Sequence, residues 1–135
     1  MKAAKLKNFE IASILKNLNS EFGLMKSNDP DKKLPVSVLW NLSKNAKKLQ
    51  ELADLLNEQE HKINSNYFNE EKSNKTENGD MEIKPEFREE FIKEKNDLYN
   101  IENEVEIHTI NINEISNLNL TPADFNAIEF MIEEE

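Results

Sequence analysis

The chain has 135 residues, of which 37% are hydrophobic and 33% charged, and its net charge is −10. It contains no cysteine, which excludes a disulfide framework, a thiolate nucleophile and a cysteine-based zinc site. Its two glycines and four prolines are too few for an all-β fold rich in tight turns. We therefore expect a mainly α fold with a minor strand component, in a single domain over residues 1–135.

The N-terminal region predicts a helix over residues 9–22. Charged residues interrupt every apolar run before this helix, which argues against a secretory signal peptide. No apolar stretch approaches the length that spans a bilayer, so we expect a cytoplasmic protein. The apolar side chains repeat at intervals of three and four residues and form one helix face: Ile11, Ile14, Leu15, Leu18 and Phe22.

The second helix is predicted over residues 35–68 and has Pro35 in its first turn. Apolar side chains follow a seven-residue repeat along it, and Glu60 is the only polar member of the series. Such a narrow stripe must be covered by another helix. We call this stripe the seam, and its apolar members are Leu39, Leu42, Ala46, Leu49, Ala53, Leu56, Ile63 and Tyr67.

Trp40 lies beside the seam and allows two interpretations. It either caps the core where the first, second and last helices meet, or it is an anchor in a protein interface, where tryptophan is enriched. Phe125, Phe130 and Met131, near the C-terminus, share this ambiguity between core and interface.

Residues 69–80 contain no apolar side chain and end in Asn-Gly-Asp, which predicts a mobile loop before a short strand at Met81–Ile83.

A third helix is predicted over residues 85–101, and its apolar stripe is expected to cover the far half of the second helix in a long antiparallel helical hairpin. Glu60 and Glu94 interrupt the two stripes, so the register should separate them or leave both at a wet edge. The apolar members of the third helix's stripe are Phe87, Phe91, Leu98 and Ile101.

The C-terminal region predicts a strand followed by a helix. Apolar and polar residues alternate over residues 104–112, which is typical of a half-buried strand. Its partner could be residues 81–84, the first residues of the chain, or another subunit. The last helix is predicted over residues 122–133, because Thr121 suits the N-cap and proline suits the first helical position.

The sequence shows no motif for catalysis, cofactor binding or metal binding. His61 and His108 are the only histidines, and neither has a convincing second ligand at metal-binding spacing. A glycine-rich phosphate loop and a nucleophile elbow are both absent. We therefore expect no enzyme activity, no cofactor and no metal ion, and a metal-dependent enzyme is kept only as a minor alternative.

Charge is distributed unevenly along the chain. Residues 1–50 carry a net charge of +6, whereas residues 51–135 carry −16. One interpretation is that these charges are solvated helix faces. The other is a dipolar molecule whose acidic half faces a basic partner, or the basic end of another copy. Direct nucleic-acid binding is not expected, because the lysines are loosely spaced and Arg88, the only arginine, lies in the acidic half.

Two parts of the chain carry a family resemblance. Residues 32–37 (Lys-Lys-Leu-Pro-Val-Ser) lead into residues 42–49 (Leu-Ser-Lys-Asn-Ala-Lys-Lys-Leu). Residues 105–108 (Val-Glu-Ile-His) precede Leu120, Pro122 and residues 128–132 (Ile-Glu-Phe-Met-Ile). The first part resembles the start of the long helix in a family of small bacteriophage and prophage proteins of unknown function. The second resembles that family's C-terminal strand and helix. The resemblance implies a phage origin and a cytoplasmic or virion-associated role, and it implies no catalytic or ligand residues.

We predict a non-enzymatic, phage-encoded accessory protein that binds and modulates a bacterial protein, such as a defence component, through its acidic surface. The alternative is a virion structural or assembly protein, or a chaperone for one, that self-associates through the helical seam. A homo-oligomer is expected, without direct contact to nucleic acid or membrane. The side chains expected to contact a partner or a second copy are Leu39, Trp40, Leu42, Leu49, Leu56, Ile63, Tyr67, Phe87, Phe91 and Phe130.

Overall fold

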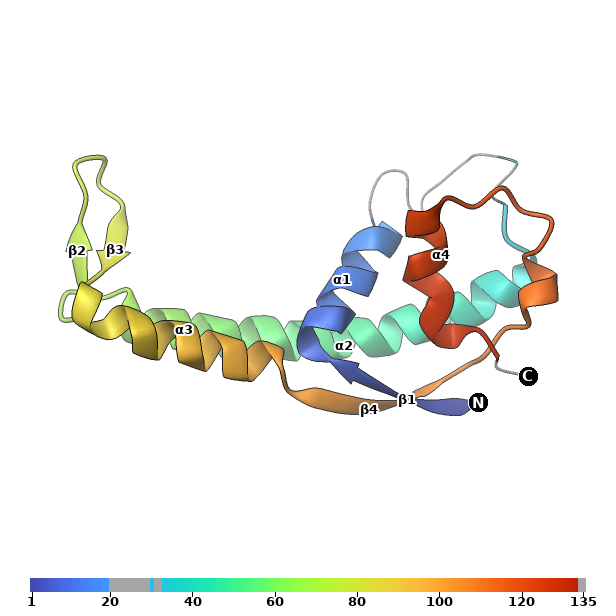
Figure 1. Cartoon of the computed structure of the whole chain (residues 1–135), viewed down its shortest axis with the longest axis horizontal. Helices are drawn as coiled ribbons and strands as arrows, with labels where there is room; N and C mark the ends of the chain where they lie inside the picture. The colour runs from blue at the N-terminus through green and yellow to red at the C-terminus, as the bar shows by residue number, and fades with distance from the viewer. Residues whose placement is uncertain (20–29, 31–32, 134–135) are drawn as a thin grey trace. The chain divides into compact units, whose positions relative to one another are not determined.

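The computed structural model describes residues 1–19, 30 and 33–133, and Figure 1 shows the course of the chain. These residues form a mainly helical fold with four α-helices and two two-stranded sheets, in agreement with the predicted fold class. The predicted helix end at residues 20–22 lies outside the described residues. The elements are β1 (Lys2–Lys7), α1 (Asn8–Asn19), α2 (Val36–Tyr67), β2 (Ser73–Lys75), β3 (Met81–Ile83), α3 (Pro85–Tyr99), β4 (Glu102–Ile107), η2 (Ile112–Glu114), α4 (Pro122–Ile128) and η3 (Glu129–Met131).

The chain divides into two compact units. Unit 1 comprises Met1–Ala53 and Glu102–Glu135, and unit 2 comprises Asp54–Ile101. The large buried apolar cluster belongs entirely to unit 1. Beyond Leu56 the second helix becomes polar and offers too few apolar side chains to extend that cluster. The buried apolar side chains described in unit 2 are Leu56, Tyr67 and Ile83.

The sheet of unit 1 joins the start of the chain to a strand near its end. β1 pairs antiparallel with β4, which places Ala4 opposite Val105 and Lys5 opposite Glu104. The sequence leaves three possible partners for β4, and the first residues of the chain are the partner that the structure shows. Ala4 and Val105 pack on the core side. Lys5 and Glu104 are exposed, and opposite charges in such a pair add roughly 0.2–1 kcal/mol.

β4 begins at Glu102 and ends at Ile107, rather than at the predicted residues 104 and 112, because α2 takes over the hydrogen bonds of the following backbone. The Asn45 side chain is fully buried, donates from Nδ2 to the carbonyl of His108 at 2.9 Å, and accepts from the His108 N–H at 2.9 Å. Ile110 then forms an isolated parallel bridge with Ile132. The alternating pattern after residue 107 thus corresponds to single pairings instead of a strand ladder.

α1 supplies one wall of the core of unit 1. Its predicted start at residue 9 lies one position after the observed start at Asn8. The apolar spacing of three and four residues places Ile11, Leu15 and Leu18 on a single buried face. These side chains lie in the same cluster as those of β4, α2 and α4.

α4 begins as the sequence predicts and ends earlier. Thr121 Oγ1 accepts from the Asp124 N–H at 3.1 Å, and Asp124 Oδ2 accepts from the Thr121 N–H at 3.1 Å. The helix ends at Ile128 and is followed by η3, whereas the prediction extends to residue 133. The reason is a tertiary pairing: the Ile110 N–H donates to Met131 O at 2.9 Å, which draws the chain after η3 into extended backbone.

α2 is a 32-residue helix in the region predicted over residues 35–68. Its seam is covered within the chain itself for most of its length. Leu39, at the first position of the seam, is 40% exposed, and Ile63 is half-buried. The buried members of the seam are Leu42, Leu49, Ala53, Leu56 and Tyr67.

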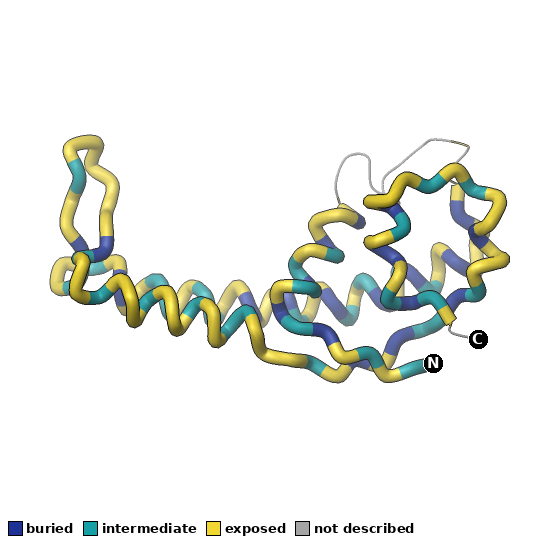
Figure 2. The backbone as a smooth tube through the Cα atoms, viewed as in Figure 1, coloured by how far each residue is buried: buried dark blue, intermediate teal, exposed yellow. Residues whose placement is uncertain are grey.

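Side chains of α3 contact the part of α2 that belongs to unit 2. The rings of Phe91 and Tyr67 meet edge to face, with 5.3 Å between their centroids. No side chain of α3 is fully buried, and Figure 2 shows this helix as exposed or intermediate along its length. α3 ends at Tyr99 rather than at the predicted residue 101, because β4 begins at Glu102 and requires extended backbone.

The segment predicted as a mobile loop, residues 69–80, contains a strand. β2 pairs antiparallel with β3, with Ser73 opposite Ile83, and both side chains are buried. Gly79 adopts a φ of +85° in the connecting turn, a conformation that favours glycine. The predicted strand Met81–Ile83 is confirmed. The sequence does not predict β2, because Ser-Asn-Lys has no apolar or β-branched residue.

Candidate functional site

An apolar surface is exposed at the N-terminal end of α2. Val36 is 84% exposed, Trp40 is 63% exposed, and Leu39 lies beside them. Trp40 lies about 160° around the helix from the buried Leu42, so it points away from the core. The interpretation that Trp40 caps the core is therefore wrong. An exposed tryptophan is uncommon, since this residue is highly buried on average.

Lysines follow Trp40 along α2, whereas one turn before it the Ser37 hydroxyl donates to Glu114 Oε2 at 3.4 Å. Lys44 Nζ lies 5.3 Å from the centroid of the Trp40 ring, within the range of a cation–π interaction. Lys47 is exposed and follows two turns after Trp40 on the same side of α2. We call this surface the Trp40 face: Val36, Leu39, Trp40, Lys44 and Lys47.

A hollow of about 410 Å³ lies in unit 1 among β1, α1, α4 and η3. Phe9, at its edge, is 48% exposed, and Glu10 and Glu129 are the charged residues in its lining. Lys7 approaches the Phe9 ring at 6.0 Å. We call this feature the Phe9–Phe130 hollow, and it is lined by Leu6, Phe9, Glu10, Ser13, Ile14, Asn126, Glu129 and Phe130.

A second hollow of about 470 Å³ lies beside α4, and Asn126 lines both hollows. It is formed by the segment from Ile112 to Pro122 together with Phe125 and Asn126. Its lining is mostly apolar and contains no charged side chain. This hollow therefore offers apolar contact without a preference for the charge of an occupant.

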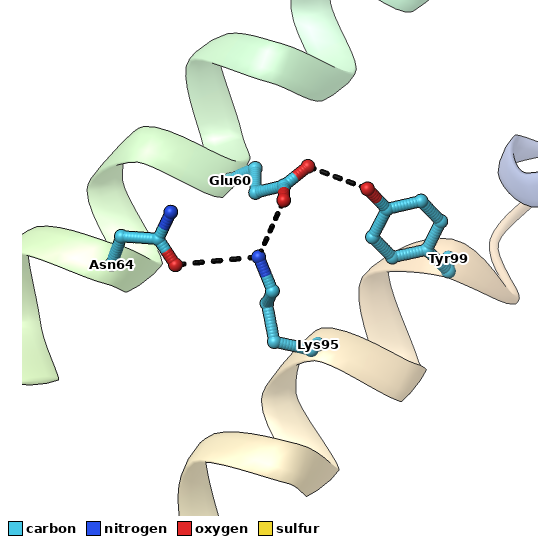
Figure 3. A network of polar contacts seen from close by, with 4 residues as sticks. All are labelled: Glu60, Asn64, Lys95 and Tyr99. Carbon is cyan, nitrogen blue, oxygen red and sulfur yellow. Dashed lines mark hydrogen bonds and ion pairs between the residues drawn. The ribbon is translucent and has the colours of Figure 1, made fainter. Parts of the chain in front are cut away.

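A polar network connects α2 and α3 in unit 2 (Figure 3). Lys95 Nζ donates to Glu60 Oε1 at 2.6 Å and to Asn64 Oδ1 at 3.3 Å, and the Tyr99 hydroxyl donates to Glu60 Oε2 at 2.5 Å. These hydrogen bonds lower the pKa of Glu60, and the bond to Glu60 raises the pKa of Tyr99 to about 12. Glu94 lies beside Tyr67 instead, so the register separates Glu60 from Glu94.

The Glu60 network is suited to structure and not to proton transfer. A carboxylate with a lowered pKa stays ionised at neutral pH, and a tyrosine with a pKa of about 12 stays protonated. A general acid or base works best with a pKa near the operating pH. We therefore assign the network a role in holding α3 against α2.

Replacing Glu60 with glutamine is expected to reduce the acid sensitivity of folding. Because the pKa of Glu60 is lowered in the folded protein, its contribution is complete above the ordinary value of 4.5 and is lost as the pH falls. The free energy of unfolding should therefore drop less for Glu60→Gln than for the wild type between neutral pH and about pH 3. Urea denaturation at both pH values measures this. Glu58→Gln, at an exposed carboxylate, is the control and should match the wild type.

The two histidines lie in different units. His61 is exposed on α2 in unit 2, and His108 is half-buried in unit 1. Desolvation, and then the charges of Lys44 and Lys48, lower the pKa of His108. Within the described residues, no group of three or more His, Asp or Glu side chains is placed to hold a metal ion. None of the helices described has the length and apolar character needed to cross a membrane.

The predicted contact residues fall into three groups. Leu42, Leu49, Leu56 and Tyr67 are buried within the chain and offer no surface to a partner. Ile63, Phe87, Phe91 and Phe130 are half-buried, and Phe130 lines the Phe9–Phe130 hollow. Only Leu39 and Trp40 are exposed. The prediction did not include Val36 or Phe9; Val36 lies one turn before Trp40, which is the signal that identifies it.

Comparisons of the chain with protein-family models, curated proteins and solved structures found no match. Function is therefore inferred from the surfaces of the two units and from the sequence. In the described part of the chain, the exposed apolar side chains of Val36, Leu39 and Trp40 lie within five successive residues of α2.

Proposed function

We propose that this chain is a non-enzymatic accessory protein that acts by binding another protein, with the Trp40 face as the main contact surface. The observation that carries the proposal is the exposure of the single tryptophan beside Val36 and Leu39. Tryptophan is enriched among the residues that dominate the binding energy of interfaces. Trp40 lies on a long regular helix, which holds an anchor residue in a defined position.

The proposed setting is the cytoplasm of a bacterial cell, in line with the resemblance to phage and prophage proteins. The target there is a bacterial protein, such as a defence component, whose activity the chain modulates. The exposed residues of α3 include several glutamates, among them Glu86, Glu89 and Glu90. This acidic surface would speed the encounter with a basic partner at low ionic strength.

A role in assembly is the second candidate. The seam is largely buried within the chain, so it is not the surface through which copies would associate. The Trp40 face and the Phe9–Phe130 hollow instead form a pair of opposite character, one lysine-flanked and the other containing glutamates. This pair supports self-association, in the virion or as a chaperone for one of its components.

The proposal also includes the arrangement of α2 and α3. We infer that α2 and α3 act as a long helical hairpin, with coiled-coil-like packing along the seam. The bonds from Lys95 and Tyr99 to Glu60 and the contact between Phe91 and Tyr67 support it. Such a hairpin would display the acidic α3 on a rigid element.

Replacing Trp40 with alanine is expected to abolish specific binding while leaving the fold intact. Cross-linking in bacterial cells, followed by quantitative mass spectrometry, compares the proteins joined to the wild type and to Trp40→Ala. We expect a loss of at least about tenfold for the specific partner, as for an interface anchor. Ile92→Ala removes a side chain that is 55% exposed on α3 and serves as the matched control. Unchanged cross-linking of Trp40→Ala would contradict the proposal.

A further inference from the structure

We infer that the Trp40 face of one copy binds in the Phe9–Phe130 hollow of a second copy. This inference rests on the proposed function, in which the Trp40 face binds protein, and it names the partner. The best complement to a lysine-flanked tryptophan is an apolar hollow that contains carboxylates. The chain carries such a hollow, formed around Phe9 and Phe130 with Glu10 and Glu129 in its lining.

Charge favours this pairing. Lys44, beside the Trp40 ring, and Lys47 would approach Glu129, which is exposed on η3. Glu10 and Glu129 are the charged side chains that line the hollow, and both are acidic. Glu10 is less free to pair with a lysine of a second copy, because its Oε1 already accepts from the Lys7 N–H at 3.0 Å. Glu129 is therefore the carboxylate that we expect to pair with the lysines of the Trp40 face.

Size and surface character agree with the same occupant. The hollow, at about 410 Å³, lies within the range of roughly 300–1,000 Å³ found for ligand pockets. The exposed Phe9 ring offers an aromatic edge against which an indole can pack. The second hollow is slightly larger, but its lining has no charged group to meet Lys44. The second hollow therefore lacks charge complementarity to the Trp40 face, and we assign the contact to the Phe9–Phe130 hollow instead.

The position of the two surfaces on unit 1 determines the type of assembly. Leu42, on the opposite side of α2 from Trp40, packs in the same core as α1 and α4. The Phe9–Phe130 hollow lies among β1, α1, α4 and η3. The two surfaces share no residue, so the contact between copies is head-to-tail. A contact of this kind continues into a ring or a filament instead of closing as a symmetric dimer.

Trp40 is the only tryptophan, so its fluorescence reports the contact directly. Sedimentation velocity and emission spectra are recorded from about 1 μM to about 1 mM protein. We expect oligomers larger than a dimer and a blue shift of the emission over the same concentrations. Trp40→Ala and Glu129→Lys should each raise the apparent dissociation constant at least about tenfold. Glu77→Lys makes the same charge change at an exposed position between β2 and β3 and should behave as the wild type.

Mixing the two defective variants tests the orientation of the contact. Glu129→Lys retains Trp40, and Trp40→Ala retains an intact hollow, so together they should form a one-to-one complex with blue-shifted emission. The double variant Lys44→Glu/Glu129→Lys should recover self-association by exchanging the two charges.

A wild type that stays monomeric, or oligomers that persist in Trp40→Ala, would overturn the inference. So would a mixture of the two variants that gives no complex. If the wild type is monomeric but Trp40→Ala still loses a bacterial partner in cells, only the self-association is wrong. If Trp40→Ala keeps every cross-linked partner, the proposed function itself is wrong.

Discussion

Replacing Asn45 with alanine is expected to lower the free energy of unfolding by about 3 kcal/mol. The side chain is fully buried in unit 1 and makes two hydrogen bonds of 2.9 Å with the backbone of His108. Removing it leaves a carbonyl and an N–H without these partners, and each unsatisfied buried group costs roughly 1–3 kcal/mol. Urea denaturation followed by circular dichroism measures the change.

Asn41→Ala is the matched control for Asn45→Ala. Asn41 lies one turn earlier on the same side of α2 and donates one long bond of 3.4 Å to the Thr109 carbonyl. It is only half-buried, so water can replace the lost bond. The control should lose less than about 1 kcal/mol. Equal losses in the two variants would show that the Asn45 pairing does not hold this part of the backbone.

Replacing Leu49 with alanine is expected to destabilise the chain by about 2–5 kcal/mol, as for other buried leucines. Leu49 is a fully buried member of the seam and lies in the core cluster of unit 1. Trp40→Ala, nine positions earlier on the exposed side of α2, should change the stability by no more than about 0.5 kcal/mol. Both are measured by denaturation at low protein concentration, where self-association does not contribute.

This comparison separates the core from the contact surface. If Leu49→Ala left the stability unchanged and instead abolished association, the seam would be a surface for other copies. If Trp40→Ala unfolded the chain, the Trp40 face would be part of the core. We expect the opposite pattern, because Leu49 is fully buried and Trp40 is exposed.

The sequence predicts elements whose signals are local. The position of α2 follows from its repeat and from Pro35, and the start of α4 follows from Thr121 and Pro122. Met81–Ile83 is a strand as its pattern indicates. Each of these depends on side chains a few residues apart, and such patterns determine helix starts and strand faces.

The missed features depend on contacts between distant residues. β1 could be named only as one of three possible partners for β4, because Lys-Ala-Ala-Lys-Leu-Lys has no strong strand pattern of its own. β4 ends where Asn45 pairs with His108, and α4 ends where Ile110 pairs with Met131. The exposure of Trp40 follows from which face of α2 the core covers, and neighbouring positions alone did not determine it.

The pairing of β1 with β4 has a consequence for folding speed. The Asn103 side chain bonds the Leu6 carbonyl across 97 positions of the chain, and the two strands are paired over their whole length. Contacts this distant in sequence require a large loss of chain entropy before they form, which slows folding. Unit 2 lies within the intervening stretch, so its early formation would shorten the loop that remains to be closed.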